Sequence, residues 1–135
     1  MLKLVNASRG RAGLPGLRLA PGYTDVARRW SHAMAARHAL VHNPRLVANV
    51  RVSGGATWRA VGENVAFGYS ADVVFQMYMR SPPHRSNILG RTYRYIGVGW
   101  VETGAGPGYT TLVFSNSYSA RYGPSRVQPA RCTTH

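Results

Sequence analysis

The sequence predicts an α+β domain whose helices come first along the chain and pack on a small, mainly antiparallel sheet formed by later segments. Residues 23–40 repeat apolar side chains three and four positions apart, which is the spacing of one helix face. Residues 94–101 alternate large side chains with Tyr95, Gly97 and Gly99, which is the period of a strand. The turn sequence TGAGPG then leads into YTTLVFSNS, which we expect to return as a second strand.

The N-terminal half is expected to be mostly helical. LKLVNASRGRAG reads as a helix that turns Leu2, Leu4 and Val5 toward a core, and LPGLRLAPG breaks it. The helix over 23–40 is the strongest prediction, with its apolar stripe formed by Tyr23, Val26, Ala27, Trp30, Ala33 and Met34. Residues 45–53 are expected to be extended or looped, and GGATWRAV is expected to form a short helix leading into Gly62, Glu63 and Asn64.

Two further helices are predicted before the strands. The first begins at Ser70, a good N-cap, and carries the apolar face Val73, Val74, Met77 and Tyr78. The second is the compact segment SPPHRSNILG, with Ser81 as cap, Pro82 at the first helical position and Gly90 as a left-handed C-terminal cap. The last residues, 119–135, form a basic C-terminal tail that we expect to be loosely held.

Composition limits the classes of function. At 135 residues the chain makes one domain, and no run approaches the roughly 18 apolar residues of a membrane span. The single cysteine, Cys132, cannot form an intrachain disulfide. The net charge of +13 comes from basic residues scattered along the chain, sixteen of them arginine. We therefore do not expect nucleic acid as the partner, and favour salt-sensitive attraction to an acidic cell wall or lipid surface.

Three residues in distinctive short segments are the candidates for chemistry: His42 in VHNP, Glu63 in GENVAFG and His84 in SPPHRSNIL. Two imidazoles and a carboxylate can hold zinc or another divalent cation, with one position left open. The alternative is a hydrogen-bonded network in which Glu63 fixes the histidines without any metal. If Glu63 sits between the two histidines, we expect its charge to raise the pKa of both.

The order and wording of these segments, with YIGVGW following, resemble the CAP superfamily in its bacterial SCP-like form. CAP is named for cysteine-rich secretory proteins, antigen 5 and pathogenesis-related 1 proteins. The resemblance covers about residues 2–117 and implies a three-layer α-β-α sandwich over 1–118. It also implies a central cleft around His42, Glu63 and His84, to which Asn64, Tyr78 and Arg85 could contribute. Family members often have a second acidic residue before the second histidine, but MYMRSPPH contains none.

The function expected from this resemblance is that of an extracellular bacterial binding or interaction module. Its cleft would hold a divalent metal or a small ligand such as a lipid or a cell-wall component. The alternative is a metal-assisted hydrolase, a peptidase or esterase, that uses the same three residues. The resemblance implies a secreted or cell-surface location. Because this chain carries no recognisable leader, a cytoplasmic location stays open. Neither catalysis nor the oligomeric state is predicted.

Overall fold

The computed structural model describes residues 1–54 and 58–119 and contains five helices around a four-stranded sheet within those ranges. The predicted tail therefore lies almost wholly outside the described residues, as does Cys132. No described helix has the length and apolar character that crossing a membrane requires. In chain order the elements are α1 (Leu2–Arg11), β1 (Arg18–Leu19), α2 (Pro21–Arg37), α3 (Leu46–Val52), β2 (Val61–Gly68), α4 (Ala71–Arg80), α5 (Pro82–Ile88), β3 (Tyr95–Val101) and β4 (Gly108–Ser115).

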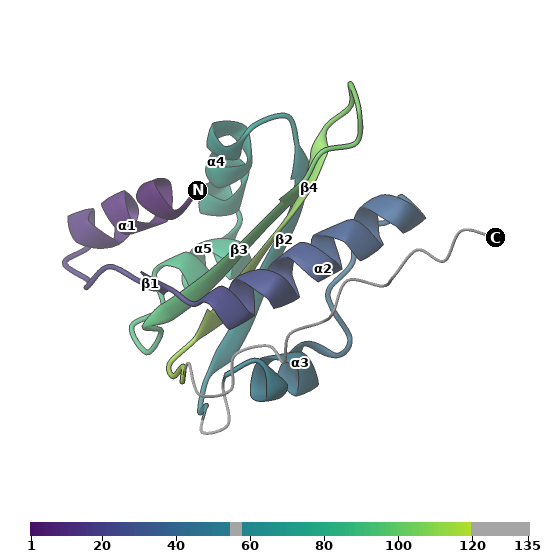
Figure 1. Ribbon diagram of the computed structural model, residues 1–135. Coiled ribbons are helices and arrows are strands. Elements are labelled where there is room, and N and C mark those ends of the chain that lie inside the picture. The colour runs from purple at the N-terminus through teal and green to yellow at the C-terminus, as the bar shows by residue number, and fades with distance from the viewer. Residues whose placement is uncertain (55–57, 120–135) are drawn as a thin grey trace.

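The elements form three layers, as Figure 1 shows, with α2 and α3 on one face of the sheet and α1, α4 and α5 on the other. The strand order is β1-β3-β4-β2; only the short β1 runs parallel to its neighbour, and the other two pairings are antiparallel. Strand β4 is central and buried along its whole length. Its Leu112 and Phe114 pack toward α4 and α5, whereas Val113 packs toward α2. The α-β-α sandwich predicted from the resemblance is confirmed.

Two glycines of β3 set the distance between the sheet and α2. A Cβ atom on Gly97 would lie 2.1 Å from the backbone carbon of Tyr23, and one on Gly99 would lie 2.4 Å from that of Ala27. The strand alternation expected for 94–101 is therefore present. Its small-residue face lies against a helix backbone, because only glycine allows so close an approach.

A buried arginine connects α1 to the end of α5 and to the segment that follows it. Arg9 has no exposed surface, and its guanidinium donates to the carbonyls of Pro15 (2.9 Å), Ile88 (3.0 Å), Gly90 (2.8 Å) and Tyr93 (3.4 Å). The carbonyls of the last turn of a helix lack intrahelical partners, and a cation near them is favourable. Arg9 therefore acts as the C-terminal cap of α5.

One expectation about the end of α5 is wrong. Gly90 does not adopt the left-handed conformation, and the helix ends at Leu89 with φ of −95°. The N–H of Gly90 still donates to the carbonyl of Asn87 at 3.2 Å, and Arg9 bonds the next carbonyl, that of Ile88, so the helix ends without a left-handed residue. By contrast, Ser70 caps α4 as predicted, because its hydroxyl accepts a hydrogen bond from the N–H of Val73 at 3.2 Å.

Three other sequence expectations need correction. Residues 45–53, expected to be extended, contain the helix α3. The segment leading into Glu63, expected to be helical, enters the strand β2, although residues 55–57 are outside the described ranges. The helix predicted over 23–40 begins at Pro21 and ends at Arg37, since His38 takes a left-handed conformation with φ of 50°. These corrections place His42 on a connecting segment and Glu63 on a strand.

Candidate functional site

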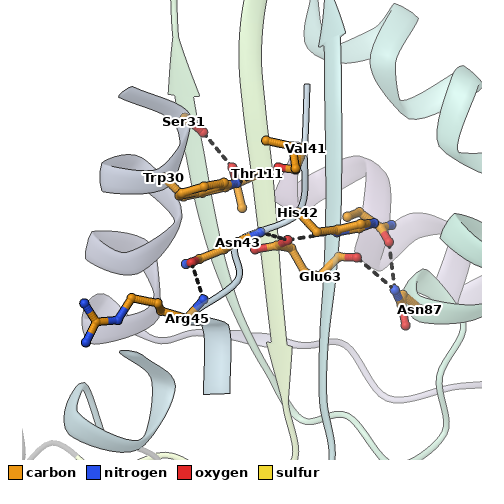
Figure 2. A network of polar contacts seen from close by, with 10 residues as sticks. Trp30, Ser31, Val41, His42, Asn43, Arg45, Glu63, Asn87 and Thr111 are labelled. Carbon is orange, nitrogen blue, oxygen red and sulfur yellow. Dashed lines mark hydrogen bonds and ion pairs between the residues drawn. The ribbon is translucent and has the colours of Figure 1, made fainter. Parts of the chain in front are cut away.

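His42 lies on the connection between α2 and α3, and neighbouring residues hold this connection at two points. The carbonyl of Val41 accepts a hydrogen bond from the indole N–H of Trp30 on α2 at 2.8 Å. The side-chain oxygen of Asn43 accepts from the N–H of Arg45 at 2.9 Å, which turns the chain into α3. Figure 2 shows His42 between these two attachments, directed toward Glu63. The segment thus presents its imidazole in a defined position.

Glu63 lies on β2, opposite Val113 of β4, and is buried. Its Oε1 accepts two hydrogen bonds, from Nδ1 of His42 at 2.9 Å and from the backbone N–H of Asn43 at 2.8 Å (Figure 2). The carboxylate is 3% exposed, whereas the His42 side chain is 66% exposed. A buried carboxylate therefore orients an imidazole that faces solvent, with Nδ1 of the ring directed at the carboxylate.

A pair of asparagines connects Glu63 to α5. Asn64 donates from Nδ2 to the carbonyl of His84 at 2.9 Å, and its Oδ1 accepts from Asn87 at 2.9 Å. Asn87 also donates to the backbone carbonyl of Glu63 at 3.2 Å (Figure 2). These bonds fix α5 against β2. We call the residues His42, Glu63, Asn64, Tyr78, His84 and Asn87 the His–Glu cluster.

His84 is anchored through the serine that precedes its helix. Nδ1 of His84 lies 2.9 Å from the hydroxyl of Ser81, and the ring centroid lies 5.2 Å from that of Tyr78. Ser81 occupies the N-cap position of α5, but its side chain makes no capping hydrogen bond to the helix backbone. The predicted capping role of the Ser81 hydroxyl is therefore wrong, and the hydroxyl positions the imidazole instead.

The expected effect of Glu63 on the histidines is wrong for His84. Burial lowers the pKa of His84, and the nearby charge of His42 lowers it further. Desolvation disfavours the charged imidazole, and the carboxylate is engaged with the other histidine. Both effects favour the neutral form of the His84 imidazole.

Two buried polar atoms of the cluster have no hydrogen-bond partner among the described residues: Oε2 of Glu63 and the hydroxyl of Tyr78. Tyr78 is 1% exposed, and burial, followed by the charge of Glu63, raises the pKa of its phenol far above the usual value. A buried polar atom without a partner costs free energy, so such atoms are rare in folded proteins. The structure thus places an unused acceptor and an unused donor in the same cluster.

The described residues contain no group of three His, Cys, Asp or Glu side chains arranged to hold a metal ion. His42 and Glu63 meet directly, but Glu63 uses one oxygen to orient His42, as an outer-shell carboxylate does for a metal-bound histidine. The expected set of His42, Glu63 and His84 as three direct zinc ligands is not the arrangement seen. Zinc binding stays a prediction for this site, and no chemical step is assigned to it.

The remaining predicted residue, Arg85, has no hydrogen bond to the cluster among the described residues and lines a separate cavity with Ser8, Arg11 and Met79. Sequence reasoning missed the contacts that Asn43 and Asn87 make with Glu63. Asn43 and Asn87 stand next to or three residues after a candidate histidine, in VHNP and HRSN. A side-chain amide so close to each candidate histidine could have indicated that these asparagines take part in the cluster.

A cavity of about 160 Å³ lies on the α2 side of the same connection. It is lined by Val26, Arg29, Trp30, Asn43, Asn49, Val52 and Ser53. Asn43 therefore contributes to this cavity while its backbone N–H bonds Glu63. Neither histidine of the His–Glu cluster lines it, so the cavity does not correspond to the cleft expected around His42, Glu63 and His84.

Comparison with known proteins identifies the family to which this sequence is similar. The family model "CAP: Cysteine-rich secretory protein family" matches residues 2–114. The uncharacterised protein YkwD of Bacillus subtilis is 31% identical over 109 residues, which cover 78% of this chain and 42% of YkwD. The chain thus spans less than half the length of that relative.

Solved structures agree on the fold. An extracellular protein containing an SCP domain from Bacillus anthracis matches with a TM-score of 0.75 and 25% identity, covering 86% of this chain and 39% of that one. An outer surface protein from Borrelia burgdorferi matches with a TM-score of 0.77 and 14% identity, covering 86% of this chain and 89% of that one. At 14% identity the latter likeness concerns the fold alone.

Proposed function

This chain belongs to the CAP family of cysteine-rich secretory proteins, in its bacterial SCP-like form, and we propose that it is an extracellular binding module. The proposed binding site is the His–Glu cluster. The proposed ligand is a small polar molecule that carries hydroxyl and amide groups, such as a soluble fragment of the cell wall. Its extracellular location is part of the proposal, supported by the SCP-domain relative that is described as extracellular.

The observation that carries this proposal is the uneven use of the Glu63 carboxylate. One oxygen holds His42 and Asn43, while the other is buried without a described partner, as is the hydroxyl of Tyr78, whose pKa the charge of Glu63 helps to raise. A hydroxyl group can donate to a carboxylate and accept from a phenol, so such a ligand suits both atoms. Because the side chain of His42 is largely exposed, a ligand can reach the His–Glu cluster from solvent on this side. Because both atoms are buried, binding requires a local movement of the covering side chains.

The polar character of the cluster favours this class of ligand over a lipid chain. Its binding groups are imidazoles, amides, a carboxylate and a phenol, and specific polar contacts of this kind provide orientation in ligand sites. A hydrolase with the same residues has no specific observation in its favour. The hydroxyl of Ser81 lies beside His84, but His84 has no carboxylate partner of its own among the described residues.

The test is a titration of uniformly 15N-labelled protein with N-acetylmuramyl dipeptide, followed by amide chemical shifts. We expect saturable shifts at His42, Asn43 and Glu63, lost in His42→Ala and retained in His32→Ala. His32 is a matched control because it is an exposed histidine on α2. Shifts that persist in His42→Ala, or no saturable shift, would contradict the assigned ligand.

A parallel calorimetric titration with zinc chloride separates the alternatives. Tight one-to-one zinc binding that is lost in both His42→Ala and Glu63→Ala would establish a metal centre and justify a screen for hydrolysis. If neither zinc nor the dipeptide binds, the His–Glu cluster is a structural hydrogen-bond network. Its role would then be limited to holding α5 and the 41–45 connection against the sheet.

A further inference from the structure

A basic cavity opens at the edge of the sheet where β1 meets β3, and it shares no residue with the His–Glu cluster. Its volume is about 450 Å³, and it is lined by Pro15, Gly16, Arg18, Arg94, Tyr95 and Asn116. We call it the edge cavity. Its size falls in the range of small-molecule sites and exceeds what a single small ion needs.

The fold brings the two arginines of the edge cavity together through the shortest strand of the sheet. β1 consists of two residues, and Arg18 lies opposite Tyr95 in the parallel pairing with β3. The N–H of Arg18 donates to the carbonyl of Arg94 at 2.9 Å. The backbone pairing of β1 therefore fixes two guanidinium-bearing residues as direct neighbours.

One of these guanidinium groups is held in place and still has free donors. Nη1 of Arg94 donates to the carbonyls of Arg91 (2.7 Å) and Tyr93 (2.9 Å). Its Nε and Nη2, and the whole guanidinium of Arg18, make no hydrogen bond to the described residues. Preorganised donors of this kind lose little conformational entropy when they bind an oxyanion.

No carboxylate among the described residues pairs with the two arginines of the edge cavity. Within residues 1–54 and 58–119, the one ion pair is that of His42 with Glu63, so neither Arg18 nor Arg94 has a carboxylate partner there. Arg9 adjoins the cavity, because it donates to the carbonyl of Pro15, which lines it. Burial lowers the pKa of Arg9, and repulsion from Arg94 lowers it further. An anion in the edge cavity would relieve that repulsion.

A third side chain also offers a donor. The Oδ1 of Asn116 accepts from the N–H groups of Arg59 (2.8 Å) and Ala60 (3.0 Å), and its Nδ2 makes no hydrogen bond within residues 1–54 and 58–119. A site rich in free donors and poor in free acceptors suits a ligand that only accepts hydrogen bonds. Guanidinium groups match phosphate oxygens in geometry and charge.

We propose that the edge cavity binds a phosphate group carried on a larger molecule, with Arg18, Arg94 and Asn116 as its contacts. Two guanidinium groups balance the double charge of a phosphate monoester and exceed that of a diester. The volume beyond the phosphate itself accommodates a short polyol or a headgroup. The phosphate could belong to a free ester or to a phospholipid headgroup, and the two sources give different results in the test below.

The first arm titrates glycerol 1-phosphate into 15N-labelled protein at constant ionic strength. We expect saturable amide shifts at Gly16, Arg18 and Tyr95, with at least tenfold weaker binding in Arg18→Gln and in Arg94→Gln. Arg37→Gln is the matched control because it removes the same charge from an exposed position at the end of α2. An equal loss in the control, or shifts that do not saturate, would overturn the proposal.

Arg18→Gln keeps the test independent of folding, since its guanidinium bonds to none of the described residues, and a thermal melt confirms its fold. The second arm measures co-sedimentation with vesicles of phosphatidylglycerol and, for comparison, of phosphatidylcholine. Binding to phosphatidylglycerol that is lost in Arg18→Gln and displaced by glycerol 1-phosphate identifies a lipid headgroup. Saturable binding of glycerol 1-phosphate without vesicle binding identifies a free ester. Vesicle binding that Arg18→Gln and Arg37→Gln weaken equally reflects overall charge and counts against the site.

Discussion

Arg9 and Glu63 are both buried charged residues, but the protein satisfies them differently. The guanidinium of Arg9 donates to four backbone carbonyls contributed by separate segments of the chain. The carboxylate of Glu63 has two hydrogen bonds on one oxygen and none from the described residues on the other. Arg9 is enclosed completely, whereas Glu63 contacts a histidine that is largely in solvent.

This difference separates a charge that supports the fold from one that remains available for binding. A buried charge with all of its partners present gains enough electrostatic energy to offset desolvation, and removing it strands those partners. A buried charge with one unpaired oxygen retains part of its desolvation cost in the folded state. We therefore expect variants of Arg9 to change mainly the stability of the fold, and variants of Glu63 to change mainly the binding of a ligand.

The largest expected effect belongs to Arg9. We expect Arg9→Met to lower the free energy of unfolding by about 3–5 kcal/mol, because four backbone carbonyls lose a charged donor that is itself fully buried. Arg9→Lys should recover only part of this loss, since an ammonium cannot reach all four carbonyls. Urea unfolding followed by circular dichroism measures both variants. Arg37→Met serves as control, and an equal loss there would show that Arg9 has no special structural role.

The next effect concerns the unused hydroxyl of Tyr78. We expect Tyr78→Phe to raise the free energy of unfolding by about 1 kcal/mol, because the variant removes a buried group that has no described partner and keeps the ring. Differential scanning calorimetry in the absence of ligand measures the change. A loss of stability of similar size would mean that the hydroxyl is satisfied, by water or by Oε2 of Glu63.

Glu63→Gln sharpens the comparison with Arg9 because it removes a buried charge while preserving shape. We expect the free energy of unfolding to change by about 1 kcal/mol or less, since relief of desolvation offsets the weaker bond to His42. Binding of N-acetylmuramyl dipeptide should be lost in the same variant. A destabilisation as large as that of Arg9→Met would place Glu63 with Arg9 as a structural residue.

The smallest effect is a pH dependence from His84. Its pKa is lowered in the folded protein, so the unfolded chain binds a proton that the folded one refuses. Its contribution to stability is therefore complete above the unfolded pKa of about 6.5 and is lost as the pH falls through the folded pKa. Unfolding free energies between pH 7.5 and 5 should fall less steeply for His84→Gln. An identical slope would contradict the lowered pKa.

The sequence, together with its resemblance to a known family, was sufficient to predict the layers of this fold and to single out His42, Glu63 and His84. The apolar spacing of α2, the alternation in β3 and the N-cap at Ser70 each reflect local physics, and each is present. β2 was wrongly expected to begin as a helix because GGATWRAV has no strand alternation, and its pairing with β4 depends on residues about 50 positions away. The α3 segment lacked caps and was too short to show helical periodicity.

The connections within the site were harder to predict than its members. His42, Glu63 and His84 stand out in the sequence, but whether a carboxylate bonds one histidine or both depends on where the backbone places it. Burial on β2 brings Glu63 to His42 and leaves His84 to Ser81. The role of Arg9 was missed for the same reason, because its carbonyl partners on α5 and beyond lie about 80 residues away.

The spacing between α2 and β3 has a consequence for how the protein tolerates mutation. Gly97 and Gly99 let the two backbones touch, so no side chain serves as a spacer that could shrink or grow. The distance between α2 and the sheet is therefore set by backbone contact at these two positions. The connection that carries His42 follows directly from α2, so its position depends on the same contact. Selection for folding alone should therefore retain glycine at both positions.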